Sequence, residues 1–340
     1  MKSAIRYILS LSMVITLFTA CSEPEGIERG EMAYINLSVD QDLLTRATAD
    51  IGTATHTVNR ILVLPFQKVN QSLPDNQAGN YVPAWTFARQ WDISSFPSSS
   101  LSLKLPVSMT YKVMVIGYNQ NDYDFSNPAM ASTRIILTNQ PTPTTLANFR
   151  LTPKAPENVP ELFVSYCIAS QGSTVIGPVF TPQPGTTISL GTTLKRFVSG
   201  LGVYVTDIPG YVKSVTLVAE RMVKSIQVND SLPVVVQTPG DLENRVIQKL
   251  VPASGSVKFN IFLLPTRTTN KSMFYLDVEY DSVVERYQIK VPDSAVSQAN
   301  GIILNPNGAV VISGSYSKIN FGFEIKGVIN LDDDAWDGIN

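Results

Sequence analysis

Short stretches in which hydrophobic and polar residues alternate recur along the whole chain. In the first of them, residues 33–39, the odd-numbered side chains are apolar and the even-numbered ones carry polar groups. Alternation with a period of two, rich in β-branched residues, is typical of a strand with one buried face. The side chains expected on the buried face are Ala33, Ile35, Leu37 and Val39.

The rest of the chain predicts an all-β protein. Residues 101–107 and 257–263 alternate in the same way, and other short apolar stretches are separated by Pro, Gly, Asn and Ser. No stretch has the period of a helix longer than a few turns, and many short strands with regular turn signals favour β-sandwiches. A turn-rich segment around residues 182–193 divides the strands into halves that can each bury a core. We therefore expect domains at residues 47–188 and 189–318.

The last predicted strand lies in the terminal segment, residues 319–340. Its apolar positions are odd-numbered, and an acidic run and a tryptophan follow them: Ile319, Phe321, Phe323, Ile325, Ile329 and Leu331, then Asp332, Asp333 and Asp334, then Trp336. A strand needs a sheet edge to pair its backbone groups. This strand either completes its own domain or pairs with another molecule. In a third arrangement, residues 321–328 complete the domain and only the final stretch is donated.

The N-terminal segment predicts export. Lys2 and Arg6 precede an apolar run, residues 7–18, that is too short for a stable membrane anchor and is typical of a secretory signal. Cys21 follows small residues, as the lipidated cysteine of a bacterial lipobox does, although Phe18 stands where leucine is usual. An ordinary signal peptide with an incidental cysteine is the alternative. We expect a lipoprotein signal at residues 1–20, and a tether with the first strand at residues 21–46.

Composition excludes several classes of function. The 26 basic and 28 acidic residues give a net charge of −2, which offers no electrostatic footprint for nucleic acid. Two cysteines cannot form a disulfide framework, and one histidine excludes a multi-histidine metal site. The motifs of hydrolases and nucleotide-binding loops are missing from the sequence, so we expect no enzyme, cofactor or metal. Cys167 lies in an apolar run and is expected to be a small buried hydrophobe.

Several short patterns occur in a fixed order along the chain. After the lipobox and the alternating strand with Thr45-Arg46-Ala47 come Arg60-Ile-Leu-Val-Leu-Pro-Phe66, Tyr111-Lys-Val-Met-Val-Ile-Gly-Tyr-Asn119, Leu194-Lys-Arg-Phe-Val198, Phe262-Leu-Leu-Pro-Thr266 and the terminal strand with its acidic run and tryptophan. Their combination and order resemble the fimbrillins, the FimA-like major and accessory fimbrial subunits of the type V pili of Bacteroidales. The resemblance covers nearly the whole chain.

The resemblance implies two transthyretin-like Greek-key β-sandwiches in tandem, exported as a lipoprotein that the Cys21 lipid anchors in the outer membrane. A trypsin-like surface protease would cut after Arg46, leave Ala47 as the new N-terminus and release the strand of residues 33–39. A donor strand from a neighbouring fimbrial subunit would then fill the vacated groove. The positions expected to donate are Ile325, Ile329, Leu331 and Trp336. An adhesion receptor is a further implied partner, and the polymer would form a cell-surface fimbrium.

Two functions stay open at the level of the sequence. The first is a structural fimbrial subunit that polymerises by strand exchange after proteolysis. The second is a non-polymerising surface lipoprotein, either an adhesin or a pilus tip or anchor subunit; an anchor would keep the lipid on Cys21. Position alone also allows Arg46 to be an ordinary basic residue of a polar loop, and its cleavage requires that the loop be exposed.

Overall fold

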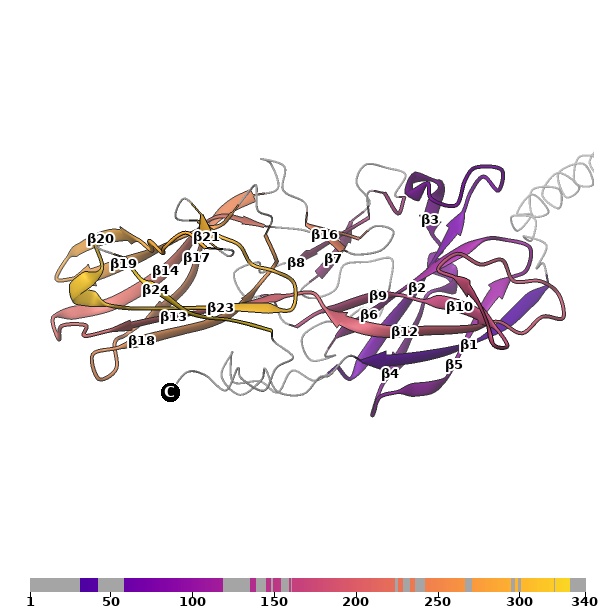
Figure 1. Cartoon of the computed structure of the whole chain (residues 1–340), viewed down its shortest axis with the longest axis horizontal. Coiled ribbons are helices and arrows are strands. Elements are labelled where there is room, and N and C mark those ends of the chain that lie inside the picture. Colours follow the sequence, from indigo (N-terminus) through magenta and orange to yellow (C-terminus); the bar gives the residue numbers. More distant parts are fainter. Residues whose placement is uncertain are drawn as a thin grey trace, which may run out of the picture.

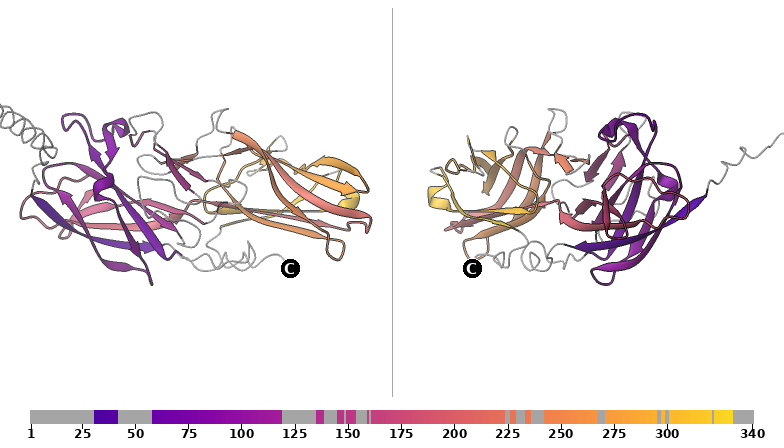
Figure 2. Two further views of the ribbon diagram at one scale, coloured as in Figure 1. Left: turned by 180° about the vertical axis from the view of Figure 1, so that it is seen from behind. Right: turned by 45° about the vertical axis from the view of Figure 1, so that its right-hand side comes forward.

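The protein is an elongated molecule built from strands. The computed structural model describes residues 31–41, 58–118, 135–138, 145–147, 149–153, 159, 161–223, 226–228, 233–235, 242–266, 271–294, 297–298, 301–320 and 322–330. Within these ranges there are strands and short 3-10 turns but no α-helix, which confirms the expected all-β class. Two sandwiches follow one another along the long axis (Figures 1 and 2).

The N-terminal sandwich is a continuous ten-stranded sheet that folds over on itself. One layer contains, in order, β5 (Ser98–Pro106), β1 (Met32–Gln41), β12 (Ser189–Arg196), β10 (Ile168–Gln171) and β11 (Thr174–Gly177). In the other layer, β3 (Tyr81–Pro83) and β4 (Arg89–Asp92) both pair with β2 (Arg60–Lys68), which is followed by β6 (Tyr111–Tyr118) and β9 (Phe163–Tyr166). The last two residues of β12 pair with β9, and this pairing joins the two layers.

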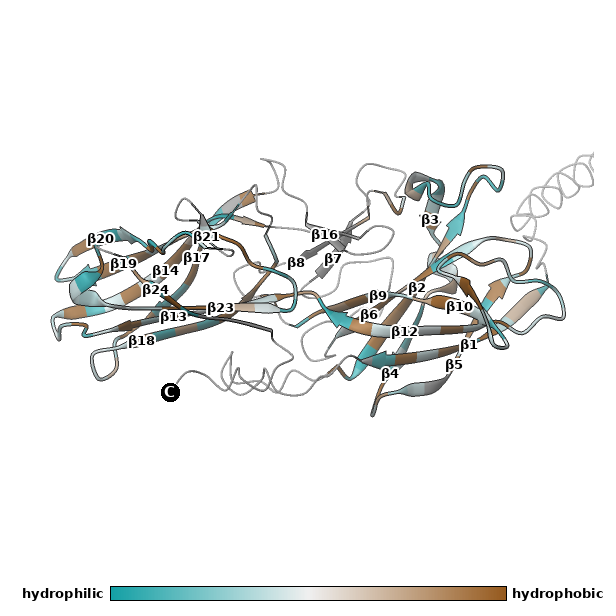
Figure 3. Cartoon of the chain, in the orientation of Figure 1, coloured by the Kyte–Doolittle hydropathy of each residue, from teal (hydrophilic) through white to brown (hydrophobic). Residues whose placement is uncertain are grey.

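Strands β2 and β6 are buried on both faces. On the face toward β1 and β5, Ile61 and Val63 belong to the core of the N-terminal sandwich. On the opposite face, Leu62 and Leu64 pack in a second cluster together with Phe149. Strands that are covered on both sides have consecutive apolar residues rather than alternating ones, as residues 61–64 of β2 and 113–116 of β6 do (Figure 3).

The C-terminal sandwich has two four-stranded layers. The first is formed by β18 (Val257–Leu263), β13 (Ser199–Thr206), β23 (Gly308–Ser315) and β24 (Glu324–Asn330). The second is formed by β17 (Leu242–Leu250), β14 (Val212–Val223), β19 (Met273–Tyr280) and β20 (Val283–Gln288). Apolar side chains of both layers form one core, which also takes in the short pair β21 (Ser297–Gln298) and β22 (Gly301–Ile302) through Ile302.

A small sheet connects the two halves of the chain. Its strands are β16 (Pro233–Val235), β15 (Ile226–Val228), β8 (Arg150–Pro153) and β7 (Ile135–Thr138). The first two come from the C-terminal half and the last two from the N-terminal half, and β15 pairs with β8. The sandwiches are therefore joined by backbone hydrogen bonds as well as by the covalent chain. Three 3-10 turns complete the described elements: η1 (Ala78–Asn80), η2 (Trp85–Phe87) and η4 (Tyr316–Lys318).

The division between the sandwiches falls one strand later than the sequence suggests. β12 begins at Ser189 but pairs with strands of the N-terminal sandwich, and the chain enters the C-terminal sandwich only after Phe197 and Val198. The turn-rich segment before it is a loop of the first sandwich, in which Gly185 adopts a positive φ of 69°. A loop inside a domain and a linker between domains have the same turn-forming composition, and for this reason the expected boundary at residues 188 and 189 is misplaced.

A buried ion pair lies at this junction. The Arg196 guanidinium donates from Nε to Glu161 Oε1 at 2.9 Å and from Nη1 to Asn307 Oδ1 at 3.0 Å. The side chains of Arg196 and Glu161 are only 2% and 4% exposed. Because Asn307 precedes β23, the arginine at the end of the N-terminal sandwich is bonded to the C-terminal one.

We expect Glu161→Gln to destabilise the protein by about 3–5 kcal/mol, since it leaves the buried Arg196 charge uncompensated. Chemical denaturation followed by circular dichroism measures this. The control is Asp92→Asn, which removes the carboxylate of an exposed pair with Arg60 and should cost about 1 kcal/mol or less. Equal losses for both variants would show that the Glu161 pair does not stabilise the junction.

The described residues of the terminal segment, 319–320 and 322–330, belong to the C-terminal sandwich. Ile319 and Phe323 are buried in the core of the C-terminal sandwich, and β24 is the last strand of its first layer. The described strand thus completes its own domain, while the final residues, 331–340, lie outside the described residues, so their donation stays a prediction.

Candidate functional site

The first strand, β1, lies in the interior of its sheet. On one side it pairs with β5 in antiparallel register, from Met32 opposite Pro106 to Val39 opposite Ser98. On the other side it pairs with β12 in parallel register, from Asn36 opposite Ser189 to Gln41 opposite Leu194 (Figure 1). We call the space that β1 occupies between β5 and β12 the groove.

The expected alternation of β1 is present in the structure. Ile35, Leu37 and Val39 have no exposed surface, and Ala33 is half-buried. Tyr34, by contrast, is 63% exposed. The odd-numbered side chains therefore face the core, as the period of two predicted.

Each buried side chain of β1 meets a defined position of the groove, which we call its slot. Ala33, Ile35 and Leu37 lie opposite apolar residues of β5, namely Leu105, Leu103 and Leu101. Leu37 also lies opposite Leu190 of β12. The register shifts between Leu37 and Val39, so the Val39 slot lies beyond a bulge, near the end of the ladder with β5.

Strand β5 depends on β1 for its place in the sheet. Among the described strands, β5 is hydrogen-bonded to β1 alone. Its apolar side chains, Leu101, Leu103 and Leu105, are buried in the same core as those of β1. Loss of β1 would therefore leave unpaired backbone groups on both β5 and β12, together with bare apolar side chains beneath them.

The outer surface of the β1 layer is polar. Tyr34 lies opposite Lys104 of β5, and the Lys104 ammonium is 4.7 Å from the centre of the Tyr34 ring. Both side chains are exposed, so this cation–π contact contributes about 0.5–1 kcal/mol at most. The strand is held chiefly by its buried face and its two ladders.

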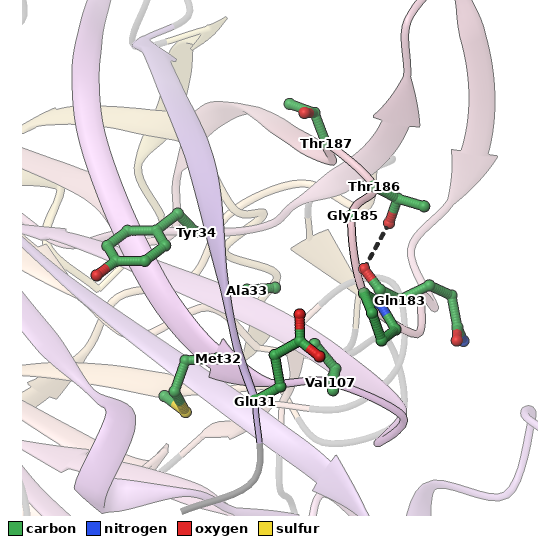
Figure 4. A pocket seen from close by; sticks show the side chains of 10 residues that line it. Glu31, Met32, Ala33, Tyr34, Val107, Gln183, Gly185, Thr186 and Thr187 are labelled. Carbon is green, nitrogen blue, oxygen red and sulfur yellow. Dashed lines mark hydrogen bonds between the residues drawn. The ribbon is translucent and has the colours of Figure 1, made fainter.

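A pocket of about 290 Å³ lies beside the beginning of β1 (Figure 4). It is lined by residues 31–34 and by the turn at residues 183–187, where Thr186 Oγ1 donates to the Gln183 carbonyl at 2.9 Å. The pocket exists because β12 begins only at Ser189, so the first residues of β1 pair with β5 but not with β12. It marks the end of the groove where β1 enters the sheet.

Two of the expected donor positions lie in β24. This strand pairs with β23 along its whole length, with Ile325 opposite Ile312 and Ile329 opposite Ala309. Ile325 is half-buried and packs against the C-terminal core. In the described structure β24 is an edge strand, because β23 is the one strand to which it is bonded.

The remaining expected site residues fall outside the described residues. They are the lipidation site Cys21, the processing site Arg46 and Ala47, and the donor positions Leu331 and Trp336. Lipidation, cleavage and donation at these positions stay predictions.

Cys167 is buried in the N-terminal core, and burial raises the pKa of its thiol, so it is a small hydrophobe rather than a nucleophile. No cluster of three or more metal-ligating side chains occurs among the described residues. Nor does any helix among them have the length and hydrophobicity needed to cross a membrane.

The sequence indicated β5 and β12, the two strands beside the groove, only in part. The alternation of Leu101, Leu103 and Leu105 identified a strand, but nothing local indicated that it would pair with β1. β12 was not recognised as a partner because its first residues fall within the turn-rich segment at residues 182–193. The signal that the sequence offers for such a partner is a strand whose apolar face matches that of β1 in length.

No family model matches the sequence, and no curated protein matches it at a significant level. Solved structures similar to this chain include the fimbrial anchor protein Mfa2 from Porphyromonas gingivalis, at a TM-score of 0.47 and 10% identity over 87% of this chain and 97% of that one. They also include the C-terminally truncated tip fimbrial protein Mfa3 of the same organism, at a TM-score of 0.40 and 11% identity over 88% and 100%. Both TM-scores are below 0.5, so this likeness assigns no function to the chain.

Proposed function

We propose that this chain is a structural subunit of a cell-surface fimbrium that is matured by cleavage after Arg46, polymerises by donor-strand exchange and supports adhesion. The observation that carries the proposal is that β1 is an interior strand joined to its sandwich only by residues 42–57, which contain Arg46. A single cut there makes β1 a separate peptide that only non-covalent contacts hold.

The groove suits exchange of one strand for another. Burying an aliphatic side chain contributes about 1.5–3 kcal/mol, and Ile35, Leu37 and Val39 are each fully buried. The backbone groups of β5 and β12 add two ladders to any strand that enters. A segment with the same alternation can thus replace β1 without an active site or a covalent bond. A contact in which the C-terminus of one copy enters the N-terminal sandwich of the next is head-to-tail and produces a filament.

The replacement strand is proposed to come from the C-terminal segment, with Ile325, Ile329, Leu331 and Trp336 as its apolar side chains. As an edge strand, β24 can leave its sheet by losing a single ladder. The two sandwiches are proposed to be of the transthyretin-like Greek-key type, in accordance with the resemblance to fimbrillins.

The same proposal places the precursor at the outer membrane. Lipidation of Cys21 would hold it there, and a trypsin-like surface protease would release it for assembly with neighbouring fimbrial subunits. Its target of adhesion would be a receptor on another cell.

A second candidate function is a non-polymerising surface lipoprotein, either an adhesin or a pilus tip or anchor subunit. The observation that favours it is the pairing of β24 with β23 along its whole length. A chain that keeps both β1 and β24 in place is complete as a monomer.

N-terminal sequencing of the protein taken from the cell surface tests the proposal. We expect the sequence to begin at Ala47, because β1 must be cut from the sandwich before a neighbour can replace it. A lipidated N-terminus at Cys21 would contradict the proposal and favour an anchor subunit.

A further inference from the structure

The sequence of β1 recurs near the C-terminus. Ile35-Asn36-Leu37 in β1 is identical to Ile329-Asn330-Leu331. The third residue after the leucine is an aspartate in both copies, Asp40 in one and Asp334 in the other. The position two residues before the isoleucine is small in both copies, Ala33 in one and Gly327 in the other. The copy in β1 occupies the middle of the groove, where Ile35 and Leu37 are fully buried.

The two copies also have compatible directions. β1 is parallel to β12, and β12 leads straight into β13, so β1 runs from the free end of the N-terminal sandwich toward the C-terminal one (Figure 1). β23 is parallel to β13 and β24 is antiparallel to β23. β24 therefore starts at the free end of the C-terminal sandwich and runs back toward the junction.

In a head-to-tail row of copies, the beginning of β24 in one copy meets the beginning of β1 in the next. The beginning of β24 is fixed, because Phe323 is 2% exposed and its N–H donates to the Lys290 carbonyl at 2.7 Å. If β24 turns outward just after Phe323, it enters the neighbouring groove in the direction of β1.

We propose that β24 and the residues after it replace β1 of the next copy in the register that superposes the repeat. Gly327 then takes the slot of Ala33, Ile329 that of Ile35, and Leu331 that of Leu37. This inference rests on the proposed function and specifies which donor residue fills which slot.

An alternative register, shifted by two residues, is disfavoured by the groove. It would place Gly327 in the Ile35 slot, which is fully buried in the middle of the strand, and so leave a cavity there. The proposed register brings Asp333 to the Val39 slot instead. That slot is buried in the precursor, but it lies beyond the bulge and at the end of the ladder with β5, so the acidic run must turn away from β5 there. The proposed donor thus fills one slot fewer than β1 does.

Disulfide cross-linking tests the register. In β1, Asn36 lies opposite Ser102 of β5, and both side chains are exposed. The proposed register puts Asn330 at this place, whereas the shifted register puts Val328 there. In protein that begins at Ala47, Asn330→Cys combined with Ser102→Cys should give disulfide-linked multimers under oxidation, and Val328→Cys combined with Ser102→Cys should not.

Two controls complete the experiment. Asn36→Cys with Ser102→Cys in the uncut protein should form an intramolecular disulfide, which validates the geometry of the pair. Asn330→Cys with Ser102→Cys in the uncut protein should stay monomeric, because β1 fills the groove. The uncut controls carry Cys21→Ser, and native Cys167 is buried and does not compete.

The outcomes separate the register from the function. Two outcomes would overturn the register while leaving strand exchange intact. One is disulfide-linked multimers formed through Val328→Cys, and the other is non-covalent polymers in which neither cysteine pair forms a disulfide. Protein from Ala47 that forms no polymer at all would overturn the proposed function itself.

A second variant gives an independent readout. Asp333→Val should fill the Val39 slot, so that multimers dissociate about tenfold more slowly. An unchanged dissociation rate would show that residue 333 does not occupy this slot. That result would contradict the proposed register and agree with the shifted one.

Discussion

Arg46→Ala should abolish polymerisation of protease-treated protein. As long as β1 is tethered to its sandwich through residues 42–57, it rebinds the groove as an intramolecular ligand at an effective concentration of about the millimolar range. A strand from another molecule must compete with this tethered β1 for the groove. Once the chain is cut after Arg46, β1 is an ordinary peptide that diffuses away on dilution, and the groove becomes available to a donor strand.

The measurement is size-exclusion chromatography and gel electrophoresis after treatment with trypsin. Wild-type protein should give a ladder of oligomers, and Arg46→Ala should remain a monomer. Arg46→Lys is the matched control, because trypsin cuts after lysine as well, and it should restore the ladder. If uncut Arg46→Ala polymerised as readily as the cut wild type, cleavage would not be the step that opens the groove.

Leu37→Ala should loosen β1 in the precursor more than any exposed change on the same strand. Leu37 is fully buried between Leu101 and Leu190, and truncating such a side chain costs about 2–5 kcal/mol. The free energy of unfolding of the uncut protein should fall by this amount. After cleavage the weakened β1 should dissociate about 30-fold or more faster, since each 1.4 kcal/mol corresponds to a factor of about ten. Polymerisation of the cut protein should accelerate accordingly.

Asn36→Ala is the control for this variant, because it changes an exposed neighbour on the same strand and should alter stability by about 0.5 kcal/mol or less. Thermal unfolding of the uncut proteins and light scattering of the cut ones give the two readouts. A slower assembly of cut Leu37→Ala would mean that β1 departure does not limit polymerisation.

The sequence alone was sufficient for the properties that depend on neighbouring residues. Alternation along residues 33–39 predicted both the strand and the face that it buries, because side chains of an extended chain point to opposite sides in turn. The burial of Cys167 followed from its apolar neighbours in the same way. The repeat of Ile-Asn-Leu is likewise a property of the sequence, but it acquires a meaning only when Ile35 and Leu37 are seen in their slots.

Only the tertiary structure decided which strands adjoin β1 and where one sandwich ends. β5 and β12 lie far from β1 in the sequence and on opposite sides of it in the sheet, and the pattern of β1 fits many partners equally well. The assignment of β12 to the N-terminal sandwich and of β24 to the C-terminal one depended on the same long-range pairing. The physical reason is that alternation reports which face of a strand is buried, whereas the choice of neighbours is made by the packing of the whole core.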